Sequence, residues 1–278
     1  MVRPVVVGVD GSEESLSAVA WAAREAVTRG TALRILHALE WRTSNQQFSA
    51  GVSAQQEWAQ SRIEEARQEL ALARPRLRVD AEEVDELPAK ALIDAAREAE
   101  LLVLGSRGLG GFEGWLLGSV SLAAIAHAVV PVVLVRAGWE PSAAKGDGPT
   151  VVGVGQDGSH DPLLEFAFTT AAAGGAVLRV VHVRRPEAAI GGEGEGEPGE
   201  DFLAGLLTSW RERWPEVEVE EWLTAGPAAQ HVVEAAKDAQ LLVVGRRVHR
   251  PAFGAHIGPV THAAVHHVGC PVAVVPHS

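Results

Sequence analysis

The chain contains two related copies of one segment, and this repeat limits its possible folds more than any other feature. Residues 99–135 align with residues 239–275 at a constant offset of 140, without a gap, and 15 of the 37 aligned positions are identical. A repeat of this length indicates two domains of the same type. We place them at 1–138 and 149–278, separated by the Pro- and Gly-containing segment AGWEPSAAKGDGP, residues 137–149.

Each copy alternates short apolar runs with longer segments of helical period, which is typical of β-α-β units and a parallel sheet. In the first copy we expect strands near residues 4–9, 32–39, 77–84, 101–105 and 131–136. The segment SLSAVAWAAREAV predicts the first helix, with an apolar stripe of Leu16, Val19, Ala20, Ala23 and Val27. The second copy repeats this order, so the sequence predicts two α/β domains.

The composition argues against some kinds of binding partner and covalent link. The net charge of -12 argues against nucleic acid, whose binding requires a basic surface. The sequence has no apolar run of membrane-spanning length and no charged-then-apolar leader, so we expect a cytoplasmic protein without a membrane partner. Cys270 is the only cysteine, which excludes intrachain disulfides, and its apolar surroundings predict a buried side chain.

The stretch GSRGLGGFEGWLLGS, residues 105–119, connects an apolar strand to a helix. Glycines here would let main-chain amides converge on a phosphate at the helix N-terminus, but glycines also end strands and shape turns, and both interpretations stay open. In the second copy Gly108 becomes Val248 and Ser119 becomes Pro259. A first-turn proline preserves a helix but removes one amide donor, so these changes predict that only the first copy holds a ligand.

The pattern Gly105-x2-Gly108-x9-Gly118-Ser119, between ELLVLG and VSLAAIAHAVVPVVLV, resembles the ATP-binding signature of the universal stress protein family. The segments VVVGVDGSEES and LRILHAL fit the same family, and the resemblance covers nearly the whole chain as two tandem domains. It implies an α/β fold in which each domain is an open five-stranded parallel sheet of order 3-2-1-4-5, with helices on both faces, of the adenine-nucleotide alpha hydrolase type.

The resemblance also implies that ATP binds to the first domain with its phosphates along the glycine motif. The candidate binding residues are Gly8, Val9, Asp10, Ala38, Leu104, Gly105, Arg107, Gly108, Gly118, Ser119, Val120 and Ser121. Arg107 is a candidate for neutralising phosphate charge. The second copy retains an arginine there, Arg247, although it has lost the other features, which favours a surface role for Arg107.

Asp10 follows the first strand, where a carboxylate is able to accept hydrogen bonds from ribose hydroxyls or hold Mg²⁺. It is therefore our candidate metal ligand. The alternative is that Asp10 caps the helix that follows in DGSEES, and the sequence does not separate the two roles.

Two other motifs support different interpretations. Residues 153–158 spell the dinucleotide-binding pattern G-x-G-x-x-G, although one inserted residue in a shared loop accounts for the match. His262, His266 and His267 fall on one expected helix, where an i, i+4 pair is able to bind a metal, while solvated helix histidines are the simpler interpretation. No P-loop motif and no nucleophile elbow occur.

The sequence therefore favours a universal stress protein that binds ATP and Mg²⁺ in its first domain and acts as a nucleotide-dependent sensor or regulator in a stress response. We expect a homodimer with an unknown regulatory protein partner. Catalysis is not expected beyond weak ATP hydrolysis. The alternatives are a slow ATP hydrolase or nucleotidyl enzyme on the same fold, and an interaction module that binds no nucleotide.

Overall fold

The computed structural model describes residues 3–38, 50–106, 117–140, 148–156, 158–184, 198–248 and 257–278, with the backbone alone described at 50–56, 58–59 and 198–200. Contacts divide the chain into two compact units, Met1–Pro141 and Ser142–Ser278, each described by itself below. Among the described residues, no helix combines the length and apolar character needed to cross a membrane.

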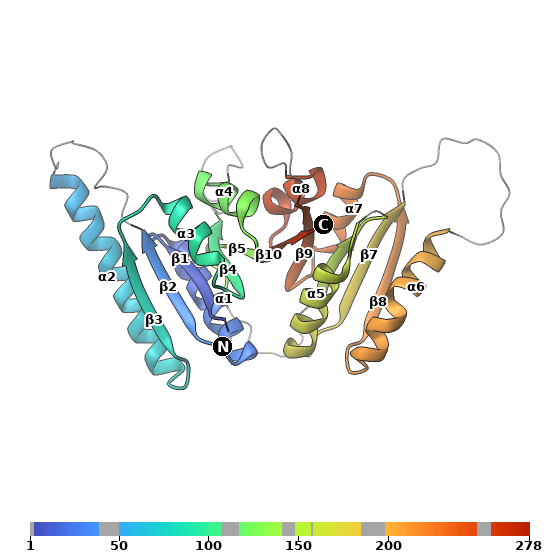
Figure 1. The fold of residues 1–278 in the computed structure, drawn as a ribbon, viewed down its shortest axis with the longest axis horizontal. Helices are drawn as coiled ribbons and strands as arrows, with labels where there is room; N and C mark the ends of the chain where they lie inside the picture. The colour runs from blue at the N-terminus through green and yellow to red at the C-terminus, as the bar shows by residue number, and fades with distance from the viewer. Residues whose placement is uncertain are drawn as a thin grey trace. The chain divides into compact units, whose positions relative to one another are not determined.

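The first unit is an open parallel sheet covered by helices (Figure 1). Its elements are β1 (Val5–Val9), α1 (Glu13–Arg29), β2 (Leu33–Ala38), α2 (Ala50–Ala73), β3 (Val79–Val84), α3 (Pro88–Ala96), β4 (Leu101–Ser106), α4 (Ser119–His127) and β5 (Val132–Arg136). The strand order is β3-β2-β1-β4-β5 and neighbouring strands are parallel, which confirms the predicted 3-2-1-4-5 topology. Each strand lies within two residues of its predicted position.

The helices of the first unit form two layers. Helix α1 packs on β1, β4 and β5 and contacts α2, whereas α3 and α4 pack on each other and on the sheet. Ser12 caps the N-terminus of α1, and Gly30 ends the helix with a left-handed φ of 65°, which a glycine adopts without strain. The small side chains of Ala18, Ala22 and Ala26 let α1 lie close to the sheet around the buried Trp21.

Two expectations about burial are wrong. Val27 is 49% exposed because the buried face of α1 is centred on its alanines and Trp21 rather than on the predicted stripe. Cys270 is half-buried, since the turn between α8 (Pro259–His267) and β10 (Val272–His277) leaves it at the edge of the core. The buried apolar runs of the central strands, by contrast, account for the core of each unit.

The second unit repeats the first. Its elements are β6 (Thr150–Val154), α5 (Asp161–Gly174), β7 (Leu178–Arg184), α6 (Pro198–Arg213), β8 (Val219–Ala225), α7 (Ala228–Ala235), β9 (Leu241–Arg247), α8 and β10. The strands lie in the order β8-β7-β6-β9-β10 and are parallel, so the same topology recurs (Figure 1).

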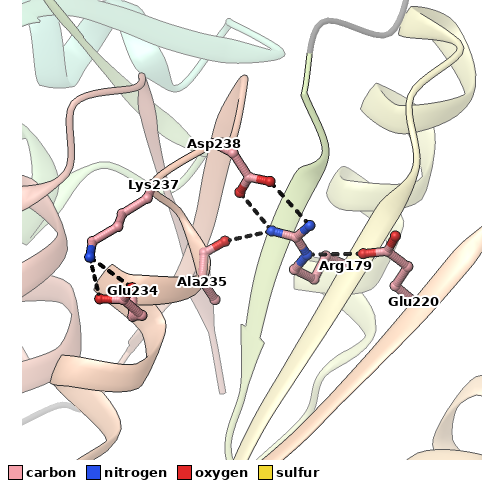
Figure 2. A network of polar contacts seen from close by, with 6 residues as sticks. All are labelled: Arg179, Glu220, Glu234, Ala235, Lys237 and Asp238. Carbon is pink, nitrogen blue, oxygen red and sulfur yellow. Dashed lines mark hydrogen bonds and ion pairs between the residues drawn. The ribbon is translucent and has the colours of Figure 1, made fainter.

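A buried arginine ties the outer strands of the second unit to α7. Arg179, the second residue of β7, donates to Glu220 on β8 at 3.0 Å, to Asp238 at 2.7 and 3.3 Å, and to the Ala235 carbonyl at 3.0 Å (Figure 2). Its guanidinium also lies 4.5 Å from the centre of the Trp222 ring. Because Arg179 lies near the amino end of its strand, this network stabilises the amino edge of the second unit's sheet.

Candidate functional site

In the first unit, parallel pairing brings the carboxyl ends of β1, β2 and β4 to one edge of the sheet. Val9 pairs with His37, and Gly8 pairs with Leu104, one residue before Gly105. The sequence-predicted residues at these strand ends therefore lie on the same edge. In open α/β sheets, ligands bind outside this edge.

Gly105 is required by packing within the protein. A Cβ on Gly105 would lie 2.6 Å from the carbonyl carbon of Glu14 and 2.7 Å from the amide nitrogen of Ser15, both in the first turn of α1. No side chain fits between these backbones. The close approach joins the end of β4 to the start of α1, and it explains Gly105 without reference to a phosphate.

Gly118 has a different environment. It is the N-cap of α4 with φ -60° and ψ 148°, it makes no side-chain cap hydrogen bond, and none of the described residues lies within 4 Å of a Cβ placed there. Neither its backbone conformation nor packing by the described residues requires glycine. The next residue, Ser119, is exposed at the first helical position.

The start of α4 therefore presents main-chain donors. The first amides of an α-helix have no partner within the helix, and in α4 the Leu122 amide donates to the Gly118 carbonyl at 2.9 Å. The amides of Ser119, Val120 and Ser121 precede it, and the helix dipole adds partial positive charge. This terminus fits a phosphate group, with the Ser119 hydroxyl as a further donor.

Ser121 has a structural role. Its buried hydroxyl donates to the Gly105 carbonyl at 3.3 Å, so it fastens α4 to β4. In the second unit, Thr261 makes the equivalent bond to Gly245 at 2.8 Å. A contact present in both copies belongs to the fold, so for Ser121 it is the main-chain amide that remains a candidate donor to a ligand.

The side chains of Val9 and Leu104 are buried in the core, and a Cβ on Gly8 would lie 2.7 Å from side-chain carbons of Leu104 and Leu92. Ala38 is the half-buried last residue of β2. These four predicted site residues therefore shape the edge of the sheet. Arg107 and Gly108 lie outside the described residues.

Asp10 is exposed and connects β1 to α1. Its Oδ1 accepts hydrogen bonds from the Ser12 amide at 3.1 Å and the Ser12 hydroxyl at 2.5 Å, while Ser12 itself caps the helix by accepting from the Ser15 amide at 3.2 Å. Asp10 therefore holds Ser12 in place, and Ser12, not Asp10, is the N-cap of α1. Burial raises its pKa, but the hydrogen bonds from Ser12 and Ser15 outweigh that effect and hold the pKa of Asp10 below its usual value. A charged carboxylate at this edge fits Mg²⁺ or ribose hydroxyls.

A histidine that the sequence reasoning missed lies beside Asp10. The buried His37 ring places Nδ1 2.8 Å from the Val9 carbonyl oxygen, and His182 makes the same contact with Val154 at 3.0 Å in the second unit. Because a carbonyl only accepts, each Nδ1 donates. The shared histidine of LRILHA and LRVVHV was the available signal, and its presence in both copies identifies a support for the end of the first strand of each unit.

The corresponding edge of the second unit is filled by the protein's own side chains. A Cβ on Gly245 would lie 2.6 Å from Nε2 of His277 and 3.1 Å from Cδ2 of Leu163, instead of against helix backbone. The Ser159 amide donates to the Ser278 carbonyl at 3.3 Å, so the loop after β6 is also covered. Pro259 stands at the start of α8, where it supplies no amide donor.

Histidines and arginines surround this filled edge. The rings of His160 and His182 lie 5.9 and 4.7 Å from the Phe202 ring. Burial lowers the pKa of His160, and the nearby His277, His182 and Arg247 lower it further against an opposing effect of Asp161. Burial also lowers the pKa of His277, with Arg247 and Arg246 adding to the effect and the Ser278 backbone opposing it. The second unit therefore places histidine side chains at this edge, where the first presents main-chain amide donors.

Comparisons with known proteins agree with this fold. The sequence profile of the Universal stress protein family matches residues 1–136 and 149–276. A universal stress protein of Mycolicibacterium smegmatis is 32% identical over 98% of this chain and 96% of its own length. The crystal structure of a universal stress protein from Archaeoglobus fulgidus covers 99% of this chain and 98% of its own, with a TM-score of 0.73 and 19% identity.

A shorter solved structure, a universal stress protein in complex with cAMP, covers 49% of this chain and 99% of its own at 29% identity and a TM-score of 0.35. That ligand is a property of the solved protein. The two family matches and the full-length relative confirm the resemblance predicted from the glycine motif: this chain belongs to the universal stress protein family, as two tandem domains.

Proposed function

We propose that the first domain binds ATP with Mg²⁺ and that the chain acts as a nucleotide-dependent sensor or regulator, the second domain having lost the site. One contrast carries the proposal. Both helices begin after a glycine N-cap, but the first domain has the exposed Ser119 at the first position of α4, whereas the second has Pro259 there and His277 against Gly245.

Each candidate residue has a defined task in this proposal. The amides at the start of α4 and the Ser119 hydroxyl bind phosphate oxygens. The carboxylate of Asp10 binds ribose hydroxyls or Mg²⁺, and the ends of β1 and β2 form the wall beside it. Mg²⁺ would neutralise phosphate charge, which matters because the chain carries a net charge of -12. Gly105 holds α1 and β4 in place.

Binding without fast hydrolysis is the function that these residues favour. Both lysines within the described ranges are engaged in exposed ion pairs, Lys90 with Glu86 and Asp94, and Lys237 with Glu234. In the proposal, the bound nucleotide orders the surface around the motif, and a protein partner recognises that surface.

The first experiment identifies the ligand. The purified chain is denatured and the released nucleotides are identified by mass. Intact ATP supports the proposal, while ADP or AMP together with measured turnover would support a hydrolase. If no nucleotide is released and titration calorimetry with ATP and Mg²⁺ gives no heat, the nucleotide-free interaction module is correct instead.

The second experiment locates the site. Ser119→Pro copies the second domain, keeps a helix-compatible first residue and removes one amide and one hydroxyl donor, so it should weaken ATP binding at least about tenfold. Pro259→Ser is the matched control in the other domain and should leave the affinity of the ATP site unchanged. Equal ATP affinity in the Ser119→Pro and unmodified chains would refute the placement at α4.

A further inference from the structure

Two histidines on α8 stand side by side. His262 and His266 are four residues apart, and the centres of their rings lie 4.4 Å from each other. Residues at this spacing project from the same side of a helix, so both imidazole rings lie on one side of α8. His262 is exposed and His266 is half-buried.

Imidazole nitrogens are ligands for Zn²⁺, Cu²⁺ and Ni²⁺. The described residues contain no group of three or more histidine, cysteine or carboxylate side chains that could hold a metal, so this pair supplies two protein ligands and water completes the coordination. The sequence HAAVH lacks the glutamate that a zinc protease helix carries between its histidines, so a binding site is indicated rather than a hydrolytic one.

The electrostatic setting favours a cation. His266 lies in the last turn of α8, where the helix dipole is negative, and the chain carries a net charge of -12. Cu²⁺ should bind most tightly, in agreement with the general order of divalent metal affinities.

The repeat shows that the fold does not require these histidines. The equivalent positions in the first copy are Leu122 and Ala126, yet α4 and α8 both have nine residues and both begin after a glycine. His267, in contrast, has the counterpart His127 in the first copy. The pair is therefore a feature added to the second domain, the one that lacks the candidate nucleotide site.

We propose that His262 and His266 form a binding site for a divalent transition metal, of the Cu²⁺, Ni²⁺ or Zn²⁺ class, on the second domain. This site and the proposed nucleotide site lie in different domains and consist of different residues.

The test is titration of the full chain with Cu²⁺, followed by calorimetry and by electron paramagnetic resonance of the bound ion. His262→Gln and His266→Gln should each weaken the tightest site at least about tenfold and remove the signature of two nitrogen ligands. His267→Gln on the same helix is the matched control and should retain both properties. Circular dichroism without metal checks that each variant is folded.

The proposal is overturned if the unmodified chain binds no Cu²⁺, if the His262→Gln and His266→Gln variants keep its affinity, or if His267→Gln loses as much affinity as they do. ATP affinity should be the same in all of these variants, which separates this result from that of the nucleotide proposal.

Discussion

The imidazole of His277 lies against Gly245, with Nε2 2.6 Å from the point at which a Cβ on that glycine would stand. In the first copy the equivalent position is Ala137, and the backbone of Glu14 and Ser15 lies against Gly105 instead. The side chain of His277 is therefore one difference between the two edges.

The buried histidines should make the second domain sensitive to acid. The pKa values of His160 and His277 are lowered in the folded chain, mainly by burial, so the unfolded chain binds more protons as the pH falls below about 6.5. Their contribution to stability is fully present above that pH and is lost as the pH drops toward the lowered pKa values. Urea unfolding of the full chain at a series of pH values measures the effect. The double variant His160→Gln, His277→Gln should show a shallower pH dependence, whereas His262→Gln should not. If the free energy of unfolding of the double variant depended on pH as steeply as that of the unmodified chain, His160 and His277 would not be the cause.

Gly105→Ala should destabilise the first domain by about 1–3 kcal/mol, because the added methyl group meets the backbone of Glu14 and Ser15, which have no room to move apart. The same substitution at Gly205, exposed within α6 and with nothing within 4 Å, should stabilise the chain by about 0.4–1 kcal/mol. Urea midpoints at constant m-value provide both numbers. Equal effects at the two positions would show that close packing does not explain Gly105.

Arg179→Ala should cost about 1–3 kcal/mol, since it removes the buried guanidinium that bonds to Asp238, Glu220 and the Ala235 carbonyl and packs on Trp222. The lower end of that range allows for the solvent exposure of both carboxylates. Arg213→Ala, which breaks the exposed pair with Glu165, is the control and should change stability by less than about 1 kcal/mol. Urea unfolding measures the free energy of unfolding of both variants. If Arg179→Ala lost no more stability than Arg213→Ala, the network would have no stabilising role.

Asp10→Asn separates support of the helix cap from binding. Asparagine keeps an oxygen that accepts from Ser12 but carries no charge, so stability should change by less than about 1 kcal/mol while ATP binding in Mg²⁺ weakens about tenfold. Ser12→Ala, in contrast, should cost about 1 kcal/mol because it removes the cap itself. Calorimetry and urea unfolding of both variants give the comparison. Loss of stability without loss of affinity in Asp10→Asn would leave Asp10 with a structural role alone.

The strands could be predicted because buried parallel strands are short apolar runs that recur in both copies, whereas their order was implied by the resemblance to the universal stress protein family. The start of α4 at Ser119 followed from the glycine before it. The exposure of Val27 could not be predicted in this way. Alanines around Trp21 form an alternative buried face, and only packing on the sheet decides between the two faces.

The candidate site was predicted in part. The order of strand, loop and helix placed its residues on one edge of the sheet. It did not show that glycine is required at position 105 by the contact with α1, which lies some 90 positions away in the sequence. The role of His277 was missed because it lies beyond the aligned segment. Its contact also depends on the loop after β6, which carries the inserted residue. Contacts between distant segments leave no periodic pattern in a sequence.

The bond from Ser121 or Thr261 to the preceding strand has a practical consequence for protein engineering. This hydrogen bond comes from the third residue of the helix and does not involve the first. The first residue is therefore free to differ between the two domains, as Ser119 and Pro259 do. A substitution that introduces a new binding group at either position would keep the hydrogen bond that holds the helix to the strand.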